Sequence, residues 1–309
     1  MPDARRTWRL QFGLGAAGLS AVLFGVIVAA TRIEFAIPSW GHLLDACRRW
    51  TIADLNAQSV LLLALGSLGL AVVALTTRSS FRQARAGRRF ARRLEGLPGL
   101  PGVRGGFVLD DARPHAFCFG LLRPRVFVSR GALESLDREE LAAVIAHELH
   151  HARRRDPLRL FVARGLADGL FFMPVLRRLG DRCAALAELD ADSAAVRATG
   201  GPQALASALL AFESHPGPMA VGIAPERVDH LLGHRSGWEL PTLMLIGAIA
   251  AGVTLLAFTV RLAQSTSHAS VALPTLVTEL CMLAMSIVPP AIGAAGLLAS
   301  RAGLRRCFG

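Results

Sequence analysis

The sequence predicts a mainly α-helical membrane protein, in which four transmembrane helices accompany one α+β domain with a small β-sheet. Hydrophobic residues make up 52% of the 309 residues, and the mean hydropathy is +0.43. The apolar character is concentrated in four uncharged blocks, whereas residues 82–239 have an ordinary soluble composition. In that region short alternating runs are followed by helical periodicity, which predicts a small sheet and then helices.

Each uncharged block has the roughly 20 apolar residues that a helix needs to cross a bilayer. We expect spans at about 10–31, 55–77, 240–260 and 277–300. The first block is long and lacks a small-residue cleavage site before Glu34, so a retained span is expected instead of a cleaved signal peptide. The expected domains are 1–77 with two spans, 78–239 as the soluble domain, and 240–309 with two spans and a short basic tail.

The formal net charge is +11, and the positive charge is all arginine because the sequence contains no lysine. Arginines gather at both termini and at residues 78–93, directly after the second predicted span. Since arginines near spans favour the cytoplasmic side, we expect a multi-pass inner-membrane protein whose termini and soluble domain are cytoplasmic. The 78–93 cluster is expected to contact anionic membrane lipids. Direct nucleic-acid binding is not expected, because the cluster carries no recognition motif.

The soluble domain begins with strands and continues as helices. Strands are expected at Phe107–Asp110, His115–Phe119 and Arg125–Ser129, after a Gly/Pro-rich connector. Asp137 followed by Glu140 has the spacing of a capping box, which predicts a helix over Arg138–Arg154. The apolar run Leu158–Leu176 contains charged residues, which favours an amphipathic helix at the membrane surface over a fifth span. Further helices are expected up to about Ala198, over Gln203–Ser214 and over Pro225–Leu232.

The predicted helix at 138–154 contains the pattern HExxH, as His147-Glu148-Leu149-His150-His151. Residues four apart share a helix face, so both outer imidazoles can bind one Zn²⁺. Glu148 lies beside them and can accept a proton from the attacking water, whose pKa the metal lowers. Such a pattern arises by chance in roughly one chain per hundred of this composition. The alternative is a helix with incidental surface histidines.

A catalytic zinc needs a third protein ligand and one open position. The following helix offers Glu188-Leu189-Asp190-Ala191-Asp192, in which Glu188 and Asp192 share a face. Glu188 can bind the metal while Asp192 hydrogen-bonds a ligating histidine. Spacing alone leaves Asp190 and Asp192 as rival ligands, and a solvated acidic face is the non-functional alternative.

Arg227 is a candidate catalytic residue, because a fixed cation can stabilise the oxyanion that develops during peptide hydrolysis. An ion pair with Glu226 or Asp229 is an equal alternative.

Four further side chains have competing interpretations. Asp156 either orients a metal ligand or belongs to a simple turn before Pro157. His230 and His234 have the spacing of a metal pair, but surface histidines are favoured. Cys118 is favoured as a small buried residue over a redox thiol.

The stretch Pro114–Asp192 resembles the BlaR/MecR antirepressor-type membrane metallopeptidases. The resemblance is carried by "HAFCFGLLRPRVFVSRGALESLDREELAAVIAHELHHARRRDP" and "AELDADSAAV", and loosely by "APERVDHLL". The chain is similar, more distantly, to the heat-shock membrane protease HtpX and the CAAX prenyl proteases. The resemblance implies a gluzincin-like zinc peptidase domain with Glu188 as third ligand, Asp192 in support, and substrate bound as an added strand. The short distance from His151 to Glu188 favours the BlaR/MecR type over HtpX.

We therefore expect a zinc endopeptidase that cleaves a protein or peptide at the cytoplasmic face, with a transcriptional repressor as one candidate substrate by analogy. The alternatives are an HtpX-type quality-control protease of membrane proteins and a non-catalytic zinc-dependent signalling protein. The intact Glu148 argues against the last. The β-lactam-sensing members carry an extracellular penicillin-binding domain after the last span, whereas this sequence ends nine residues after Ser300, so β-lactam sensing is not expected. The sequence indicates no particular oligomeric state.

Overall fold

The computed structural model describes residues 2–36, 57–214, 224–234, 241–264 and 269–272. The described chain is mostly helical and contains one three-stranded mixed sheet. The predicted fourth span at 277–300 lies outside the described residues. Contacts divide the chain into two compact units, one formed by 1–21 with 70–254 and the other by 22–69 with 255–309.

Three helices of the described chain are long and apolar enough to cross a membrane. They are α1 (Pro2–Arg32), α3 (Ala57–Arg93) and α10 (Thr242–Gln264), and they match the first three predicted spans. In the second unit the three helices share one apolar cluster, made by Val28, Ala29, Leu62, Leu65 and Leu262. Two short strands, β1 (Ile33–Ala36) and β5 (Ala269–Ala272), pair in parallel in this unit and were not predicted.

Helix α3 continues without a break past Thr77, where the predicted span ends, to Arg93. Residues 78–93 contain no proline, and arginine, alanine and glutamine are good helix formers, so the change in polarity does not end the helix. All seven arginines of this stretch are exposed. The opposite face packs on the first unit, where Ser79 donates a hydrogen bond to Asp168 and Phe90 contacts the sheet.

The predicted strands are confirmed as β2 (Gly106–Leu109), β3 (Ala116–Phe119) and β4 (Arg125–Ser129). Their order is β2-β4-β3, with β4 parallel to β2 and antiparallel to β3, so β3 is an edge strand of this sheet. Gly120 follows β3 with φ of 117°, and a side chain there would approach the carbonyl oxygen of Arg123 at 2.8 Å. A glycine is therefore required at the turn that returns the chain into β4.

The two faces of the sheet pack on different helices, because side chains alternate along a strand. One face carries Phe107, Phe127 and Phe117, which stand in register across the three strands and stack with ring centroids 5.5 and 5.4 Å apart. Phe90 of α3 lies 5.6 Å from the ring of Phe117. The other face carries buried valines of β4 that pack against Val144 of α5 (Arg138–Arg154).

Helix α5 has the predicted bounds, and the predicted capping box between Asp137 and Glu140 is present. Arg155 ends it in the left-handed conformation, with φ of 54°, and α6 (Asp156–Gly169) begins at the next residue. A short helix, α4 (Arg130–Ser135), connects β4 to α5 and was not predicted.

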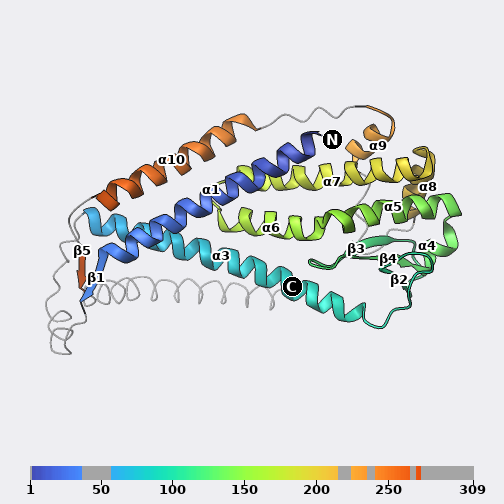
Figure 1. Cartoon of the computed structure of the whole chain (residues 1–309), viewed down its shortest axis with the longest axis horizontal. Coiled ribbons are helices and arrows are strands. Elements are labelled where there is room, and N and C mark those ends of the chain that lie inside the picture. The colour runs from blue at the N-terminus through green and yellow to red at the C-terminus, as the bar shows by residue number, and fades with distance from the viewer. Residues whose placement is uncertain (1, 37–56, 215–223, 235–240, 265–268, 273–309) are drawn as a thin grey trace, which may run out of the picture. The chain divides into compact units, whose positions relative to one another are not determined.

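The predicted single helix over Leu158–Leu176 is wrong in extent. Helix α6 ends at Gly169, and α7 (Val175–Thr199) begins after Pro174, which lacks the N–H needed to continue a helix. The next two helices, α8 (Gln203–Glu213) and α9 (Pro225–Leu231), lie within one residue of their predicted bounds. In Figure 1 helix α5 lies next to the sheet and α7 runs alongside α5 and α6, and all of them belong to the first unit.

Candidate metal centre

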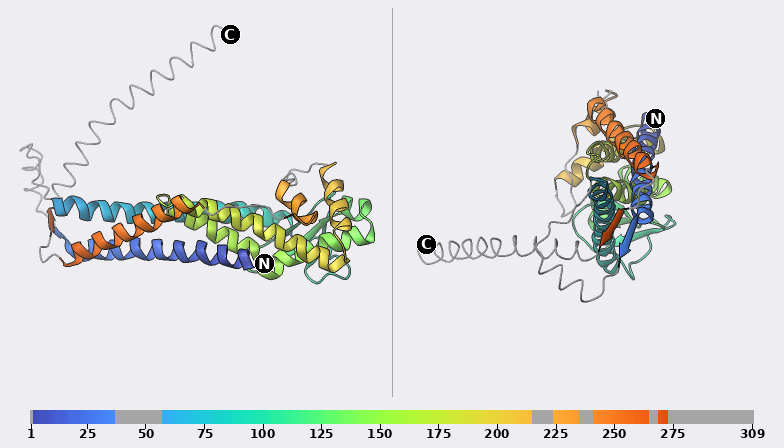
Figure 2. Two further views of the ribbon diagram at one scale, coloured as in Figure 1. Left: turned by 90° about the horizontal axis from the view of Figure 1, so that it is seen from above. Right: turned by 90° about the vertical axis from the view of Figure 1, so that its left-hand side faces the viewer.

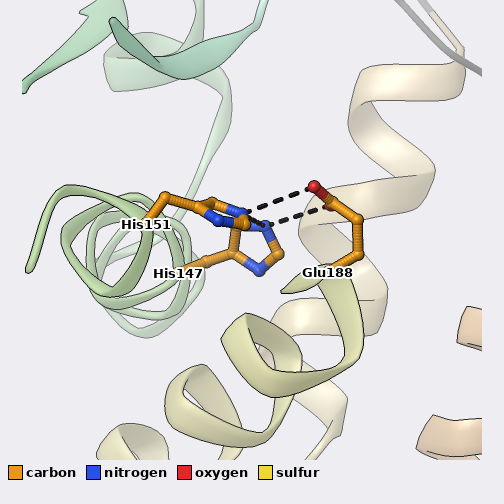
Figure 3. Close-up of side chains that lie close together, drawn as sticks. All are labelled: His147, His151 and Glu188. Atoms are coloured by element: carbon orange, nitrogen blue, oxygen red, sulfur yellow. Dashed lines mark hydrogen bonds and ion pairs between the residues drawn. The ribbon is translucent and has the colours of Figure 1, made fainter. Parts of the chain in front are cut away.

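The candidate site lies between α5 and α7, which pack against each other. His147 and His151 are one helical turn apart on α5, and both rings point toward the carboxylate of Glu188 on α7 (Figure 3). His147 is buried, His151 is nearly so, and the Glu188 side chain is 42% exposed, which leaves one side of the group open to solvent. The open side is what a catalytic metal requires for its remaining position.

The ligand atoms are spaced as a tetrahedral zinc requires. The two Nε2 atoms are 3.2 Å apart, and the Glu188 oxygens lie 3.5 Å from Nε2 of His147 and 3.4 Å from Nε2 of His151. Ligand atoms bound at about 2.0–2.1 Å around a tetrahedral Zn²⁺ are separated by about 3.3 Å. Two imidazole nitrogens and one carboxylate oxygen also form a common donor set of catalytic zinc. Within the described residues, these three are the group that could hold a metal ion.

Each ligating ring has a carboxylate behind it. Nδ1 of His147 lies 3.0 Å from Oδ1 of Asp192, whose side chain is fully buried. Nδ1 of His151 lies 2.9 Å from Oδ2 of Asp156, which is also buried. Such carboxylates hold a histidine in the tautomer and orientation that present Nε2 to the metal. The simple-turn interpretation of Asp156 is therefore not what the structure shows.

The position of Asp156 follows from the break between α5 and α6. The left-handed Arg155 redirects the chain directly after α5, so Asp156 becomes the first residue of α6 and faces back toward His151. The sequence signal was the "RRDP" segment, in which proline marks the first turn of a new helix. Composition alone did not show that Arg155 would interrupt the helix and turn Asp156 toward His151.

The group carries strong local charges. Burial would lower the pKa of His147, but contacts with Asp192 and Glu188 outweigh it and raise the pKa to about 9. Burial likewise opposes ionisation of the two carboxyls, yet hydrogen bonding to His147, together with the charge of Arg227, lowers the pKa of Glu188 and Asp192. His147 therefore lies between two carboxylates that favour positive charge at its ring. This is the charge environment expected for residues that hold a divalent cation.

Glu148 is partly buried beside the two histidines. Burial raises its pKa, and the neighbouring charges of His147 and His151 oppose that rise. Cys118 on β3 is close enough for the charges of Glu148 and Asp156 to add to the effect of burial, and its pKa rises to about 12. A thiol with such a pKa stays protonated near neutrality, which agrees with a partly buried small residue and not with a redox thiol.

Arg227 contacts neither of its predicted partners. It lies on α9, where its Nε and Nη2 donate hydrogen bonds of 2.9 and 2.6 Å to the two oxygens of Asp192. Its Nη1 lies 3.3 Å from Oε2 of Glu188. Glu226 pairs with Arg182 of α7 instead, at 2.6 Å. The sequence identified Arg227 as a candidate but did not predict these contacts. Arg227 is 35 residues from Asp192 in the chain, and no local pattern relates the two.

The remaining candidates lie apart from the metal group. Asp190 faces the other way and approaches Arg154 at 3.4 Å, so it is not a rival ligand in this arrangement. His230 lies 2.8 Å from the Ser193 hydroxyl, and both residues line a pocket of about 340 Å³. Within the described residues, neither His230 nor His234 belongs to a group of three or more possible metal ligands. Ser193 donates its hydroxyl hydrogen to the carbonyl oxygen of Leu189, so its oxygen accepts in the contact with His230.

Residues 84–210 match the sequence profile of Peptidase family M48. The matched part covers 127 of the 309 residues and includes the whole sheet, α5, α7 and the three candidate ligands. The match supports a metallopeptidase domain over this part of the chain. It ends before α9, so Arg227 lies outside it.

The chain is also similar over short stretches to curated proteins described as "Protease HtpX homolog". The relative from Acidiphilium cryptum is 42% identical over 66 residues, which are 21% of this chain and 23% of that protein. The relative from Salinibacter ruber is 42% identical over 65 residues, or 20% and 24% of the two chains. The relative from Aquifex aeolicus is 43% identical over 63 residues, or 20% and 21%. The matched stretches thus span less than a quarter of each relative's length.

Proposed function

We propose that the chain is a membrane-anchored zinc endopeptidase that cleaves protein substrates at the cytoplasmic face of the inner membrane. The observation that carries the proposal is the convergence of His147, His151 and Glu188 at the mutual spacing of zinc ligands. The M48 match over the same residues supports peptide hydrolysis as the reaction. A gluzincin-type fold is proposed on the same basis.

Each side chain of the group has a distinct task in this reaction. The two imidazoles and the carboxylate of Glu188 hold Zn²⁺, which when bound supplies Lewis acidity at the scissile carbonyl and lowers the pKa of water. Glu148 accepts the proton of the attacking water and delivers it to the leaving amine. Burial raises the pKa of Glu148, which favours acceptance of a proton by its carboxylate. Asp192 and Asp156 keep the two rings oriented.

The free edge of β3 is the proposed docking site for the substrate backbone. Strand β4 occupies one edge of β3, and within the described chain no strand pairs with the other edge. An extended peptide can add there as a further strand, so that backbone hydrogen bonds supply affinity irrespective of sequence. Helix α5 contacts β3, which brings this edge close to the helix that carries the histidines. The substrate is therefore expected to present an extended or unfolded segment.

The HtpX relatives make the HtpX-type interpretation at least as good as the BlaR/MecR type that the spacing of His151 and Glu188 favoured. An unfolded membrane protein and a transcriptional repressor are both compatible with binding to an edge strand. We favour membrane-protein quality control, because the curated relatives that this chain resembles are HtpX homologues.

Membrane placement is proposed from the three apolar helices and from the arginine distribution. The exposed arginines nearest the end of the apolar part of α3, Arg78 and Arg82, are proposed to contact anionic lipid head groups. A reporter fused after residue 93 tests this orientation, because an extracellular signal would reverse it.

The test of the function is Glu148→Gln in the full chain, purified in detergent with the wild type. We expect one equivalent of zinc in both proteins, and cleavage of an unfolded substrate such as casein to fall by about 10²–10⁴-fold in the variant. Glu134→Gln, an exposed glutamate on α4, is the matched control and should retain activity. Equal cleavage by wild type and Glu148→Gln would remove the enzyme assignment, and a wild type without stoichiometric metal would remove the zinc site.

A further inference from the structure

Helix α9 lies against α7 (Figure 2), and its Arg227 contacts the candidate ligand Glu188. None of its seven residues is buried, so α9 has no apolar core of its own. Polar side chains of α9 reach α7: Glu226 pairs with Arg182, Arg227 pairs with Asp192 and Glu188, and His230 lies 2.8 Å from the Ser193 hydroxyl. The two ion-paired positions on α7, Arg182 and Asp192, are ten residues apart, or about 15 Å of helix. Together with the His230 contact, these ion pairs fix both the position and the rotation of α9.

The guanidinium of Arg227 lies between two carboxylates that would otherwise repel each other. Glu188 and Asp192 are separated by one turn of α7, and like charges at that spacing are destabilising. Asp192 is fully buried, and a buried carboxylate without partners is strongly unfavourable. The bidentate contact satisfies both of its oxygens while Oδ1 also faces His147. Removal of Arg227 would thus disturb a metal ligand and the carboxylate behind another ligand.

We propose that α9 is a latch on the metal centre, in which Arg227 is a positioning residue that holds Glu188 and Asp192 in their metal-binding orientation. The Glu226–Arg182 pair holds the latch itself in place. This inference rests on the proposed zinc site and deepens it. It replaces the predicted oxyanion role of Arg227, because Nε and Nη2 are directed at Asp192 and Nη1 at Glu188. The latch lies beyond the M48-matched residues, so the family match does not include it.

The test is zinc affinity of the full chain in detergent, measured by competition with a chelating dye. Arg227→Ala is expected to raise the zinc Kd about 10–100-fold, as loss of groups around metal ligands does. Arg227→Lys is expected to lie between the wild type and Arg227→Ala, because an ammonium cannot bind a carboxylate in a bidentate manner. Glu226→Gln should raise the Kd only by roughly 1.5–5-fold, since that pair is partly exposed. The control Asp229→Asn, exposed on the same helix, should leave the Kd unchanged.

A kinetic measurement separates the latch from an oxyanion role. If Arg227 acts through the ligands, saturating zinc restores most of the kcat of Arg227→Ala. If it stabilised the oxyanion, the zinc Kd would stay unchanged and kcat would fall by about 10²–10³-fold at saturating zinc, which would overturn the proposal. If the wild type and the Arg227 variants bind zinc equally tightly, the latch proposal is wrong but the zinc site stands. If the wild type binds no zinc, the zinc site itself is wrong.

A double variant keeps the proposal testable if Arg227→Ala fails to fold. Arg227→Ala combined with Asp192→Asn also removes the buried charge that the single variant leaves without its cation. If Arg227 acts through Asp192, the two changes are not additive, and the zinc Kd of the double variant is well below the product of the separate effects. Additive effects on the Kd would show that the two residues act separately, and the latch would be rejected. Thermal unfolding of the zinc-free proteins shows which variants are folded.

Discussion

Replacing Asp156 by alanine should weaken zinc binding without touching a metal ligand. The carboxylate lies 2.9 Å from Nδ1 of His151, on the side of the ring opposite the metal group, and its side chain is only 3% exposed. Without it, His151 loses the acceptor that fixes its tautomer, and its Nε2 is no longer held toward the metal. The ring also gains rotational freedom in the metal-free protein.

The expected magnitude follows from the burial and from the position of Asp156 in α6. A buried carboxylate behind a ligating histidine is worth about 10–100-fold in metal affinity, or about 1.4–2.7 kcal/mol. Asp156 is also the first residue of α6, where a carboxylate stabilises the helix N-terminus by about 0.3–1 kcal/mol. That second contribution appears in the stability of the zinc-free protein as well. Asp156→Asn keeps an oxygen acceptor, so a smaller loss of roughly 3–10-fold is expected.

The assay is competition for zinc between the detergent-solubilised full chain and a chelating dye, with thermal unfolding of the zinc-free protein measured in parallel. Glu139→Gln, an exposed carboxylate in the first turn of α5, controls for a general loss of negative charge. Were Asp156→Ala to bind zinc as tightly as the wild type, the carboxylate would have no role behind His151, and the argument from the 2.9 Å contact would be refuted.

Two further predictions concern groups outside the ligand set. Because burial raises the pKa of Cys118 to about 12, its alkylation by iodoacetamide at pH 8 should be roughly a thousand-fold slower than that of an ordinary thiol. The rate is measured by mass spectrometry in a variant that retains only this cysteine, and a rate near that of a free thiol would contradict the burial. Asp137→Ala removes the capping box of α5 and should lower the free energy of unfolding by about 1 kcal/mol. Thermal unfolding measures this loss, which should leave zinc stoichiometry intact; an unchanged melting temperature would argue against the cap.

The parts of the fold that the sequence predicted are those specified by short-range patterns. The start of α5 was predicted because Asp137 and Glu140 cap it locally, and the pairing of His147 with His151 follows from helical spacing alone. The same spacing placed Glu188 and Asp192 on one face of α7. The predicted helix at 158–176 is divided because α6 ends at Gly169 and α7 begins after Pro174, a break that hydropathy does not register.

The parts that could not be predicted depend on contacts between distant segments. Asp156 reaches His151 only because Arg155 adopts a left-handed conformation between two helices. Arg227 reaches Asp192 across 35 residues, and no periodicity relates the two. The length of α3 was underestimated for a different reason, since a hydropathy block marks the apolar part of a helix and not its end. The fourth predicted span stays a prediction, because it lies outside the described residues.

The crowding of acidic side chains around the two imidazoles has a consequence for the lifetime of the protein. Glu148, Glu188, Asp156 and Asp192 surround two histidines, and Arg227 and Arg159 are the cations paired with them, so two negative charges are left for a divalent cation to offset. A metal that binds only the folded chain adds about 4 kcal/mol to its stability when present at a thousand times its dissociation constant. With zinc at the proposed site, the supply of zinc would therefore set how long each newly made copy resists unfolding and degradation.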